Sequence, residues 1–300
     1  MYRPACYGEL PADCHRYAHA IIESLRLGFA DGTHFISDPN VVPVPIKQLL
    51  SPDYLADRGS GFSTEEAIHT IQHGTPMAFS SDTVYFSVTD PDGNACSFII
   101  SNYAGFGTAI IPKGCGFTLQ NRGANFTLQP PDHSNVYAPR KRPYHTIIPA
   151  MITDPADGSL KACYGVMGGF MQPQGHVQVL LNMFVFGMTP QEALDAPRIC
   201  IDTIGSDSVS KAGDLIYLEE GMPGATVEGL KKLGHNVIVL KGHQRQQFGR
   251  GQIIRKSEED GQLVCKFQHR DCAAAGSTVL THMPDSAGSD QRGDGHASPL

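Results

Sequence analysis

The earliest regular pattern of apolar and polar positions predicts a helix over residues 15–31. Its apolar side chains return every three or four residues, whereas Glu23 and Arg26 lie on other faces. A second helix is predicted over 63–71, and the breaker sequence His-Gly-Thr-Pro at 73–76 ends it. The apolar residues that share one face of the first helix are Ala18, Ile21, Ile22, Leu25 and Phe29.

From residue 82 onward the pattern changes to strands. Residues 83–89 and 95–102 are two strand-forming runs joined by the turn sequence Asp-Pro-Asp-Gly-Asn, which indicates a β-hairpin. Residues 144–152 and 160–166 are predicted to form a further pair of buried strands. Paired glycines on both sides of 109–112 indicate tight turns or a close approach of the backbone to a ligand.

Later segments predict short helices. A Gly-rich stretch at 165–175 leads into a helix over 176–186, and Thr-Pro-Gln-Glu at 189–192 is a capping box with proline at the first helical position. A helix over 227–233 precedes a strand over 236–240. Because strands come as hairpins and helices as adjacent pairs, the expected fold class is α+β rather than alternating βαβ units.

Composition narrows the class of protein. The 300 residues are 41% hydrophobic and 18% charged, which is typical of a globular chain able to build a core. The net charge of −7 argues against nucleic acid as the main partner, because phosphate binding needs a concentrated basic face. No apolar run is long enough to cross a membrane and no signal peptide is visible, so we expect no membrane partner and a cytoplasmic location.

The eight cysteines form neither a Cys-x-x-Cys pair nor a Cys/His cluster with zinc-finger spacing. Four of them sit among apolar neighbours, where a free cysteine acts as a small hydrophobe. Reduced thiols are the simpler interpretation, and the even count leaves disulfides open. With no phosphate-binding loop or metal constellation in the sequence, we predict no cofactor and no metal. The four cysteines are Cys96, Cys115, Cys163 and Cys200.

Thr83 is the most informative single residue. It begins a strand directly after Asp82, and a polar turn and a second apolar strand follow it. This is the layout of a self-cleaving N-terminal nucleophile, because breaking the Asp82–Thr83 bond would give Thr83 a free α-amine beside its own hydroxyl. On local sequence alone the alternative is an ordinary β-forming threonine at a strand start.

Residues 15–252 resemble the gamma-glutamyltransferase (glutathione hydrolase) family of N-terminal nucleophile hydrolases. The resemblance is greatest to the soluble gamma-glutamyltransferase-like branch that grades into cephalosporin acylases, and its specificity comes from the shared order and spacing of several motifs. These motifs are Ser-Leu-Arg-Leu-Gly-Phe-Ala-Asp at 24–31, Asp-Pro at 38–39, Asp-Thr at 82–83, Leu-Gln-Asn-Arg-Gly at 119–123, Lys-Arg-Pro at 141–143, Gly-Gly at 168–169 and Ala-Leu-Asp-Ala-Pro-Arg at 193–198.

The resemblance implies a four-layer αββα sandwich and a precursor that cuts itself between Asp82 and Thr83. It divides the chain into a remnant of the large-subunit region at 1–82 and a small-subunit nucleophile domain at 83–275. Residues 276–300 are polar, with Ser, Gly, Asp and Pro dominant, so we expect them to form a disordered tail. The family's large subunit is much longer than the 82 residues before Thr83, so we expect the sandwich to be incomplete on its N-terminal side.

The resemblance also implies catalytic roles. Thr83 would be the nucleophile, and its own amine would shuttle the proton once the chain is cut. The backbone amides of Gly168 and Gly169 would stabilise the oxyanion, although an ordinary glycine turn is the alternative without the family. Ser101 falls where the family places a hydroxyl that contacts the amine of the nucleophile.

Four further residues fall on the family's substrate pocket. Arg122 and Asn125 stand where the better-known transferases have Gln and Asp, and His145 and Thr146 replace a Ser-Ser pair that binds a carboxylate. Arg122 favours a carboxylate and opposes an ammonium, whereas Asn125 can only hydrogen-bond one. His145 adds a titratable group, or is simply a packed histidine. These departures favour the acylase-like branch and a dicarboxylic amide other than a strict gamma-glutamyl one.

Two functions of different class follow. In the first, the chain is a threonine-nucleophile amide hydrolase or acyltransferase with a small-molecule substrate, acting as a heterodimer of its own cut pieces or as a homo-oligomer. In the second, it is a truncated, inactive relative that serves only as a binding partner or does not fold stably alone. An incomplete sandwich would expose one face of a sheet, which raises the need for a covering partner.

Overall fold

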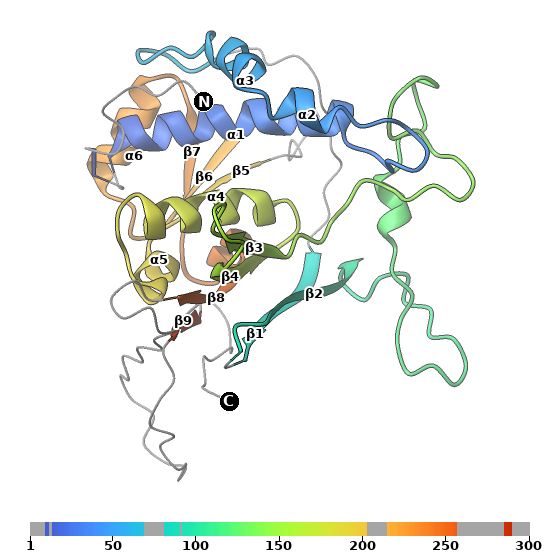
Figure 1. Cartoon of the computed structure of the whole chain (residues 1–300). Coiled ribbons are helices and arrows are strands. Elements are labelled where there is room, and N and C mark those ends of the chain that lie inside the picture. Colours follow the sequence, from blue (N-terminus) through green and yellow to red (C-terminus); the bar gives the residue numbers. More distant parts are fainter. Residues whose placement is uncertain are drawn as a thin grey trace, which may run out of the picture.

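The computed structural model describes residues 10–11, 14–68, 81–90, 92–202, 215–256 and 285–289. The described residues form six α-helices and nine strands. Figure 1 labels these elements in their arrangement in space. Two short 3-10 helices are also present, η2 (Arg122–Asn125) and η3 (Gly242–Phe248). The α-helices are α1 (His15–Phe35), α2 (Ile46–Leu49), α3 (Pro52–Gly59), α4 (Met171–Phe184), α5 (Pro190–Asp195) and α6 (Gly224–Lys232). The strands are β1 (Ser81–Thr89), β2 (Ala95–Ala104), β3 (Ala150–Thr153), β4 (Leu160–Met167), β5 (Ile199–Ile201), β6 (Leu215–Glu219), β7 (Asn236–Leu240), β8 (Arg250–Lys256) and β9 (Asp285–Ser289).

The strands belong to three sheets. The hairpin β1–β2 forms a two-stranded antiparallel sheet, and β3, β4, β8 and β9 form an antiparallel four-stranded sheet in that order. The third sheet has the order β5-β6-β7, in which β6 and β7 run parallel with α6 between them in the chain. This single parallel unit differs from the expectation of hairpins alone, since a helix connects the two strands.

The hairpin β1–β2 packs on the four-stranded sheet. Strand β1 contacts β4 and β8, and the buried ring of Tyr85 lies against Gly165 of β4, where an added Cβ would sit 2.5 Å from the ring. Helix α4 covers the opposite face of this sheet, with α5 beside it, and Val166, Val179 and Leu194 share their core. The order hairpin, sheet and helices gives three successive layers of an αββα sandwich.

The outer face of the hairpin is apolar and exposed. Its side chains alternate with the buried ones, as the period of a strand requires, and the rings of Phe86 and Phe98 stack with centroids 5.0 Å apart. None of the described residues forms a helical layer over this face, in agreement with the expected incompleteness of the sandwich. The exposed residues of the face are Val84, Phe86, Phe98 and Ile100.

Helix α1 joins a second core with the sheet β5-β6-β7 and helix α6. The predicted apolar face supplies Ala18 and Ile22, which are buried against Ile201, Leu218 and Leu230. The expected boundary at residue 82 therefore does not coincide with a break in packing, because α1 shares a core with strands that come after it. Division of the chain into 1–82 and 83–275 remains a prediction about cleavage.

Several predicted elements are confirmed. The hairpin pairs as expected, and α1, α5, α6 and β7 form where the pattern placed them. Thr189 and Glu192 make the reciprocal bonds of a capping box at the start of α5. Helix α4 begins five residues before the expected 176, because Pro173 lies within its first turn, where its missing N–H costs no intrahelical bond.

The expected helix over 63–71 is wrong in its described part, 63–68. The backbone there bonds to other elements, since Ser63 O accepts from His19 and Ala67 N donates to Leu233 O at 2.7 Å. These tertiary hydrogen bonds replace those of a helix. Residues 69–71 lie outside the described range, and the short helices α2 and α3 were not expected.

Two strand expectations also change. Of the predicted strand 144–152, only β3 forms, because Ile148 N donates to the side chain of Gln172 and Pro149 has no N–H to donate. Within the segment expected to be a disordered tail, 276–300, residues 285–289 pair with β8 as β9, since the edge of β8 accepts one more strand. The rest of that segment is outside the described range.

Candidate active site

Thr83 is buried near the start of β1, with 4% of its surface exposed. It lies opposite Ser101 of β2, and its Oγ1 donates a hydrogen bond to Ser101 Oγ over 3.1 Å. The peptide bond that joins Asp82 to Thr83 therefore lies inside a paired strand. The structure brings together the predicted nucleophile and the predicted partner hydroxyl.

A β-bulge adjoins this pair. Ser81 lies opposite Ala104 and Thr83 opposite Ser101, so β2 carries one extra residue between these positions. Tyr103, within the bulge, has a φ of +79°, a conformation that non-glycine residues rarely adopt, and its N–H donates to Ser101 Oγ over 2.9 Å. Strained backbone of this kind concentrates at functional sites. The bulge thus holds the Ser101 hydroxyl toward Thr83.

Tyr103 links the bulge to the residues predicted to line the substrate pocket, a role the sequence did not suggest. Its ring is 1% exposed and its hydroxyl donates to Asn125 Oδ1 over 2.6 Å. Asn125 Nδ2 in turn donates to Tyr144 O at 3.3 Å. The side-chain amide of Asn125 is therefore oriented by these two hydrogen bonds, one to its oxygen and one from its nitrogen.

Arg122 bridges the two halves of the site. Its Nη2 donates to Ser101 O over 2.9 Å, and its Nε donates to Thr146 Oγ1 in a short hydrogen bond. A third donor, Nη1, reaches Gln120 Oε1 at 3.3 Å. A guanidinium has five N–H donors, so two remain for a ligand after these three bonds.

Gln172 completes the connection to the glycine pair. Its buried Nε2 donates to Thr146 O over 2.6 Å and to Gly169 O over 3.1 Å. A continuous set of hydrogen bonds thus runs from Thr83 through Ser101, Arg122, Thr146 and Gln172 to Gly169. Gln172 was missed from sequence, because a glutamine in a helix start gives no signal before its two carbonyl partners are known.

Gly168 and Gly169 form the turn between β4 and α4. Their φ angles are +126° and +59°, which favour glycine, and the turn packs against Gly249, itself at +67°. Gly249 lies so close that an added Cβ would be 2.0 Å from Met167 O. Arg198, buried at the end of the Ala-Leu-Asp-Ala-Pro-Arg motif, donates to Phe248 O at 3.0 Å and so supports this second turn.

His145 lies at the pocket edge. Its imidazole stacks on the ring of Tyr144 with centroids 4.6 Å apart, and partial desolvation by this packing lowers its pKa although the residue keeps exposed surface. His145, Thr146 and Gly169 line one small pocket with Tyr103, and its free volume is about 10 Å³, room for about one water molecule. Thr83 is not among the residues that line this pocket.

Two motifs noted in the sequence meet beside the site. The buried carboxylate of Asp38 accepts from Arg142 Nη2 at 2.8 Å and from Arg142 N at 3.0 Å. Asn40 N adds a third bond to the same carboxylate at 3.1 Å. The segment that follows α1 is thus tied to the loop that leads into Tyr144 and His145.

Acidification is expected to weaken this tie. The hydrogen bonds and charge of Arg142 hold the pKa of Asp38 far below its usual value, so its contribution to stability is present above about pH 4 and lost as the pH falls further. Asp38→Asn should therefore lower the urea midpoint at pH 7 more than at about pH 2, because much of the contribution is lost only as the pH approaches the lowered pKa of the folded state. The same change at the exposed Asp53 serves as a control, and a deficit of equal size at both pH values would contradict the assignment.

None of the helices among the described residues is long and apolar enough to cross a membrane.

Comparisons with known proteins agree on the family. The family model described as gamma-glutamyltranspeptidase matches residues 7–298. The chain is 33% identical over 243 residues to the glutathione hydrolase-like YwrD proenzyme of Bacillus subtilis, which covers 81% of this chain and 44% of that protein. It is 33% identical over 244 residues to the oxamate amidohydrolase proenzyme of Klebsiella pneumoniae, with the same two shares, 81% and 44%.

A solved structure, cephalosporin acylase from Bacillus halodurans, superposes with a TM-score of 0.76 at 34% identity. The match covers 95% of this chain and 45% of the acylase. The expected α+β fold of the N-terminal nucleophile hydrolase type is thereby confirmed. The chain spans less than half the length of each of these three relatives. Because this family model matches nearly the whole chain, the chain belongs to the gamma-glutamyltranspeptidase family.

Proposed function

We propose that the chain is a threonine-nucleophile amide hydrolase or acyltransferase that processes itself between Asp82 and Thr83. The observation that carries the proposal is the partly buried hydrogen bond from Thr83 Oγ1 to Ser101 Oγ, which lies beside a strained bulge and is connected through side chains to the Gly168-Gly169 turn. The names of two relatives include the word proenzyme, which supports a processing step.

Processing would begin at the Thr83 hydroxyl. Its oxygen attacks the carbonyl carbon of Asp82, the C–N bond breaks as Thr83 N takes up the hydroxyl proton, and an ester joins the two pieces. Water then hydrolyses the ester, which leaves a carboxylate on Asp82 and a free α-amine on Thr83. Ser101 Oγ accepts the hydrogen bond of this hydroxyl over 3.1 Å and holds the oxygen in place before attack.

Turnover would repeat the attack on a substrate amide. The free amine of Thr83 takes the hydroxyl proton and passes it to the leaving amine, while the acyl group becomes an ester on Thr83 Oγ1. The amides of Gly168 and Gly169 donate to the oxyanion of each tetrahedral intermediate. Water gives hydrolysis, and an amino acid in its place gives acyl transfer.

The charge of the pocket favours an acyl group that carries its own carboxylate. Arg122 keeps two N–H donors beyond its three described bonds, whereas Asn125 is neutral and engaged by Tyr103 and Tyr144. The positive charge of Arg122 would disfavour an ammonium. We therefore propose that the preferred substrate is a dicarboxylic monoamide, such as a glutaryl amide, rather than a gamma-glutamyl amide.

A second candidate is a non-catalytic binding partner. The exposed apolar outer face of the hairpin favours it, because a face of this kind is typical of a surface that binds a partner. A non-catalytic binding partner would remain one uncut chain, so cleavage decides between the two candidates.

Hydrolysis of a substrate panel tests the proposed function. The purified chain is offered glutaryl, gamma-glutamyl and butyryl anilides together with oxamate, and release of aniline or ammonia is followed. We expect the glutaryl compound to be cut faster than the other two anilides, because its carboxylate pairs with Arg122 and it carries no ammonium. An enzyme without activity on any of these amides, cut or uncut, would support the binding partner.

Arg122→Lys is expected to reduce kcat/KM for the glutaryl anilide about tenfold or more. Lysine keeps the charge but cannot span Ser101 O and Thr146 Oγ1 with one rigid group. Butyryl anilide, which lacks the carboxylate, supplies the control. An equal loss on both substrates would show that Arg122 acts only through the shape of the site.

A further inference from the structure

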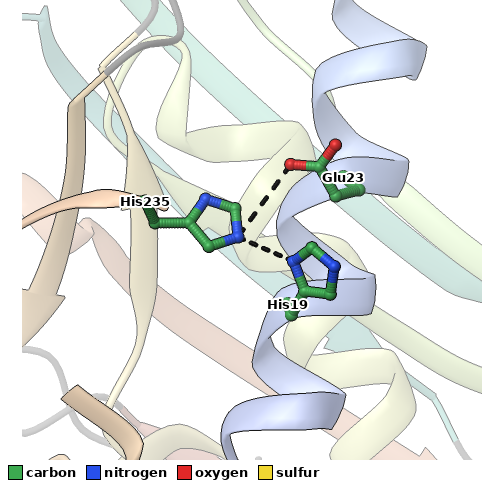
Figure 2. Close-up of side chains that lie close together, drawn as sticks. All are labelled: His19, Glu23 and His235. Carbon is green, nitrogen blue, oxygen red and sulfur yellow. Dashed lines mark hydrogen bonds and ion pairs between the residues drawn. The ribbon is translucent and has the colours of Figure 1, made fainter. Parts of the chain in front are cut away.

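Three buried residues outside the set of hydrogen bonds that links Thr83 to Gly169 come together from two parts of the chain. His19 and Glu23 lie one turn apart on α1, and His235 lies in the turn that precedes β7 (Figure 2). Their exposed fractions are 1%, 0% and 6%. One nitrogen of each histidine and one oxygen of the carboxylate all lie within 4.8 Å of one another. Such burial of three ionisable groups needs a specific compensating arrangement.

The hydrogen bonds fix which histidine atoms face the cluster. His19 Nε2 lies 2.8 Å from Ser63 O, and because a carbonyl can only accept, His19 carries its proton on Nε2. With its proton on Nε2, the imidazole of His19 presents the lone pair of Nδ1, which lies 2.7 Å from His235 Nε2. A histidine whose outer N–H donates to a backbone carbonyl has the orientation found in metal ligands.

His235 directs its Nε2 at the same point as His19 Nδ1 (Figure 2). The Glu23 carboxylate is 4.0 Å from His235 Nε2. Two imidazole nitrogens and one carboxylate are thus directed at a common point, and this is a donor set suited to zinc.

We propose that His19 Nδ1, His235 Nε2 and the Glu23 carboxylate form a binding site for one divalent transition-metal ion of the zinc class. Two nitrogens bound to one tetrahedral zinc ion lie roughly 3.3 Å apart. The two imidazoles would therefore separate slightly from the 2.7 Å of their hydrogen bond. His235 would move its proton from Nε2 to Nδ1, so no net proton is released. Water would supply the fourth ligand.

Arg26 limits the affinity of this site. Its Nη1 lies 2.9 Å from Glu23 Oε1, and the same nitrogen donates to Ile68 O at 2.8 Å. The second carboxylate oxygen accepts from Ile68 N at 3.2 Å. A metal ion must share Glu23 with a fixed cation, so binding is expected to be weaker than at a site without the arginine.

The metal would join α1 to the sheet β5-β6-β7. His19 and His235 are 216 positions apart, which is why no ligand spacing is visible in the sequence and why no metal was expected from it. If the chain is cut after Asp82, as the proposed function requires, His19 and Glu23 lie on one piece and His235 on the other. The ion would then connect the two pieces.

Zinc binding to the purified full-length chain tests the proposal. After treatment with EDTA, the protein is titrated with zinc chloride against a colorimetric chelator, and we expect one ion per chain and a rise in Tm of about 5 °C at a hundredfold excess over Kd. His235→Gln should not bind the ion, because an amide is a poor zinc ligand. The glutamine amide can still donate to His19 Nδ1, so the hydrogen bond between these positions is kept. His243→Gln, at an exposed histidine, should keep the ion.

Cobalt separates this site from the cysteines and from loss of folding. We expect cobalt(II) to give visible bands typical of nitrogen and oxygen ligands in the wild-type chain, with no thiolate charge-transfer band. A thiolate band, a chain that takes up no zinc, or equal zinc content in wild type and His235→Gln would overturn the proposal. If His235→Gln does not fold, the wild-type spectrum and Glu23→Gln decide the question. None of these measurements depends on amide hydrolysis or cleavage.

Discussion

Thr83→Ala is expected to leave the chain in one piece and to abolish amide hydrolysis. The methyl side chain removes the oxygen that would attack the Asp82 carbonyl and later carry the acyl group. Loss of a catalytic nucleophile costs several orders of magnitude, so activity should fall at least about a thousandfold. A denaturing gel and an anilide assay measure the two effects on the same preparation.

Two variants control this result. Thr83→Ser keeps a hydroxyl that can donate to Ser101, so it should retain slow cleavage and measurable turnover. Thr89→Ala changes the same residue type at the other end of β1, opposite Ala95, and should cleave and turn over normally. Turnover by Thr83→Ala at the wild-type rate would show that another residue is the nucleophile.

Gly249→Ala is expected to damage both stability and the Gly168-Gly169 turn, which is proposed to stabilise the oxyanion. Alanine is strained at a φ of +67°, and its Cβ would lie 2.0 Å from Met167 O, so the backbone before Gly168 must shift. The conformational strain and the displaced packing together should lower the free energy of unfolding by about 3 kcal/mol. Turnover should fall as well, because the Gly168 and Gly169 amides would no longer point at one oxyanion position.

Gly187→Ala is the matched control. Gly187 has the same φ of +67°, but no atom lies within 4 Å of the position of its added Cβ. It should therefore show only the conformational strain, about 1 kcal/mol, with normal turnover. Urea unfolding and the anilide assay on both variants separate strain from displacement. Equal effects of the two substitutions would contradict the support that Gly249 gives to the glycine turn.

The sequence predicted those elements whose determinants are local. The capping box of α5 and the hairpin turn between β1 and β2 specify their structures within a few residues, and both formed as expected. Helix α1 formed because its apolar face has a partner in the sheet β5-β6-β7. Residues 63–68 failed as a helix because their backbone groups bond to α1 and to the end of α6 instead.

Much of the candidate site could be placed from the sequence only through the family resemblance. Thr83, Ser101, Arg122, Thr146 and Gly169 prove to lie along one set of hydrogen bonds. The roles of Tyr103 and Gln172 could not be predicted from sequence. Tyr103 has a positive φ and Gln172 lies in a helix, and the function of each depends on hydrogen-bond partners that are distant in the sequence. The same holds for Arg198, whose motif was visible but whose support of the Gly249 turn depends on the folded chain.

The state of the purified chain tests the central claim most directly. Intact mass and N-terminal sequencing should find two pieces, and the heavier should begin at Thr83 and contain 218 of the 300 residues, since 82 precede Thr83. Both pieces should remain together in native buffer, because α1 shares its core with β5 and β6. A single uncut chain of 300 residues, or a new N-terminus at any other position, would contradict the account.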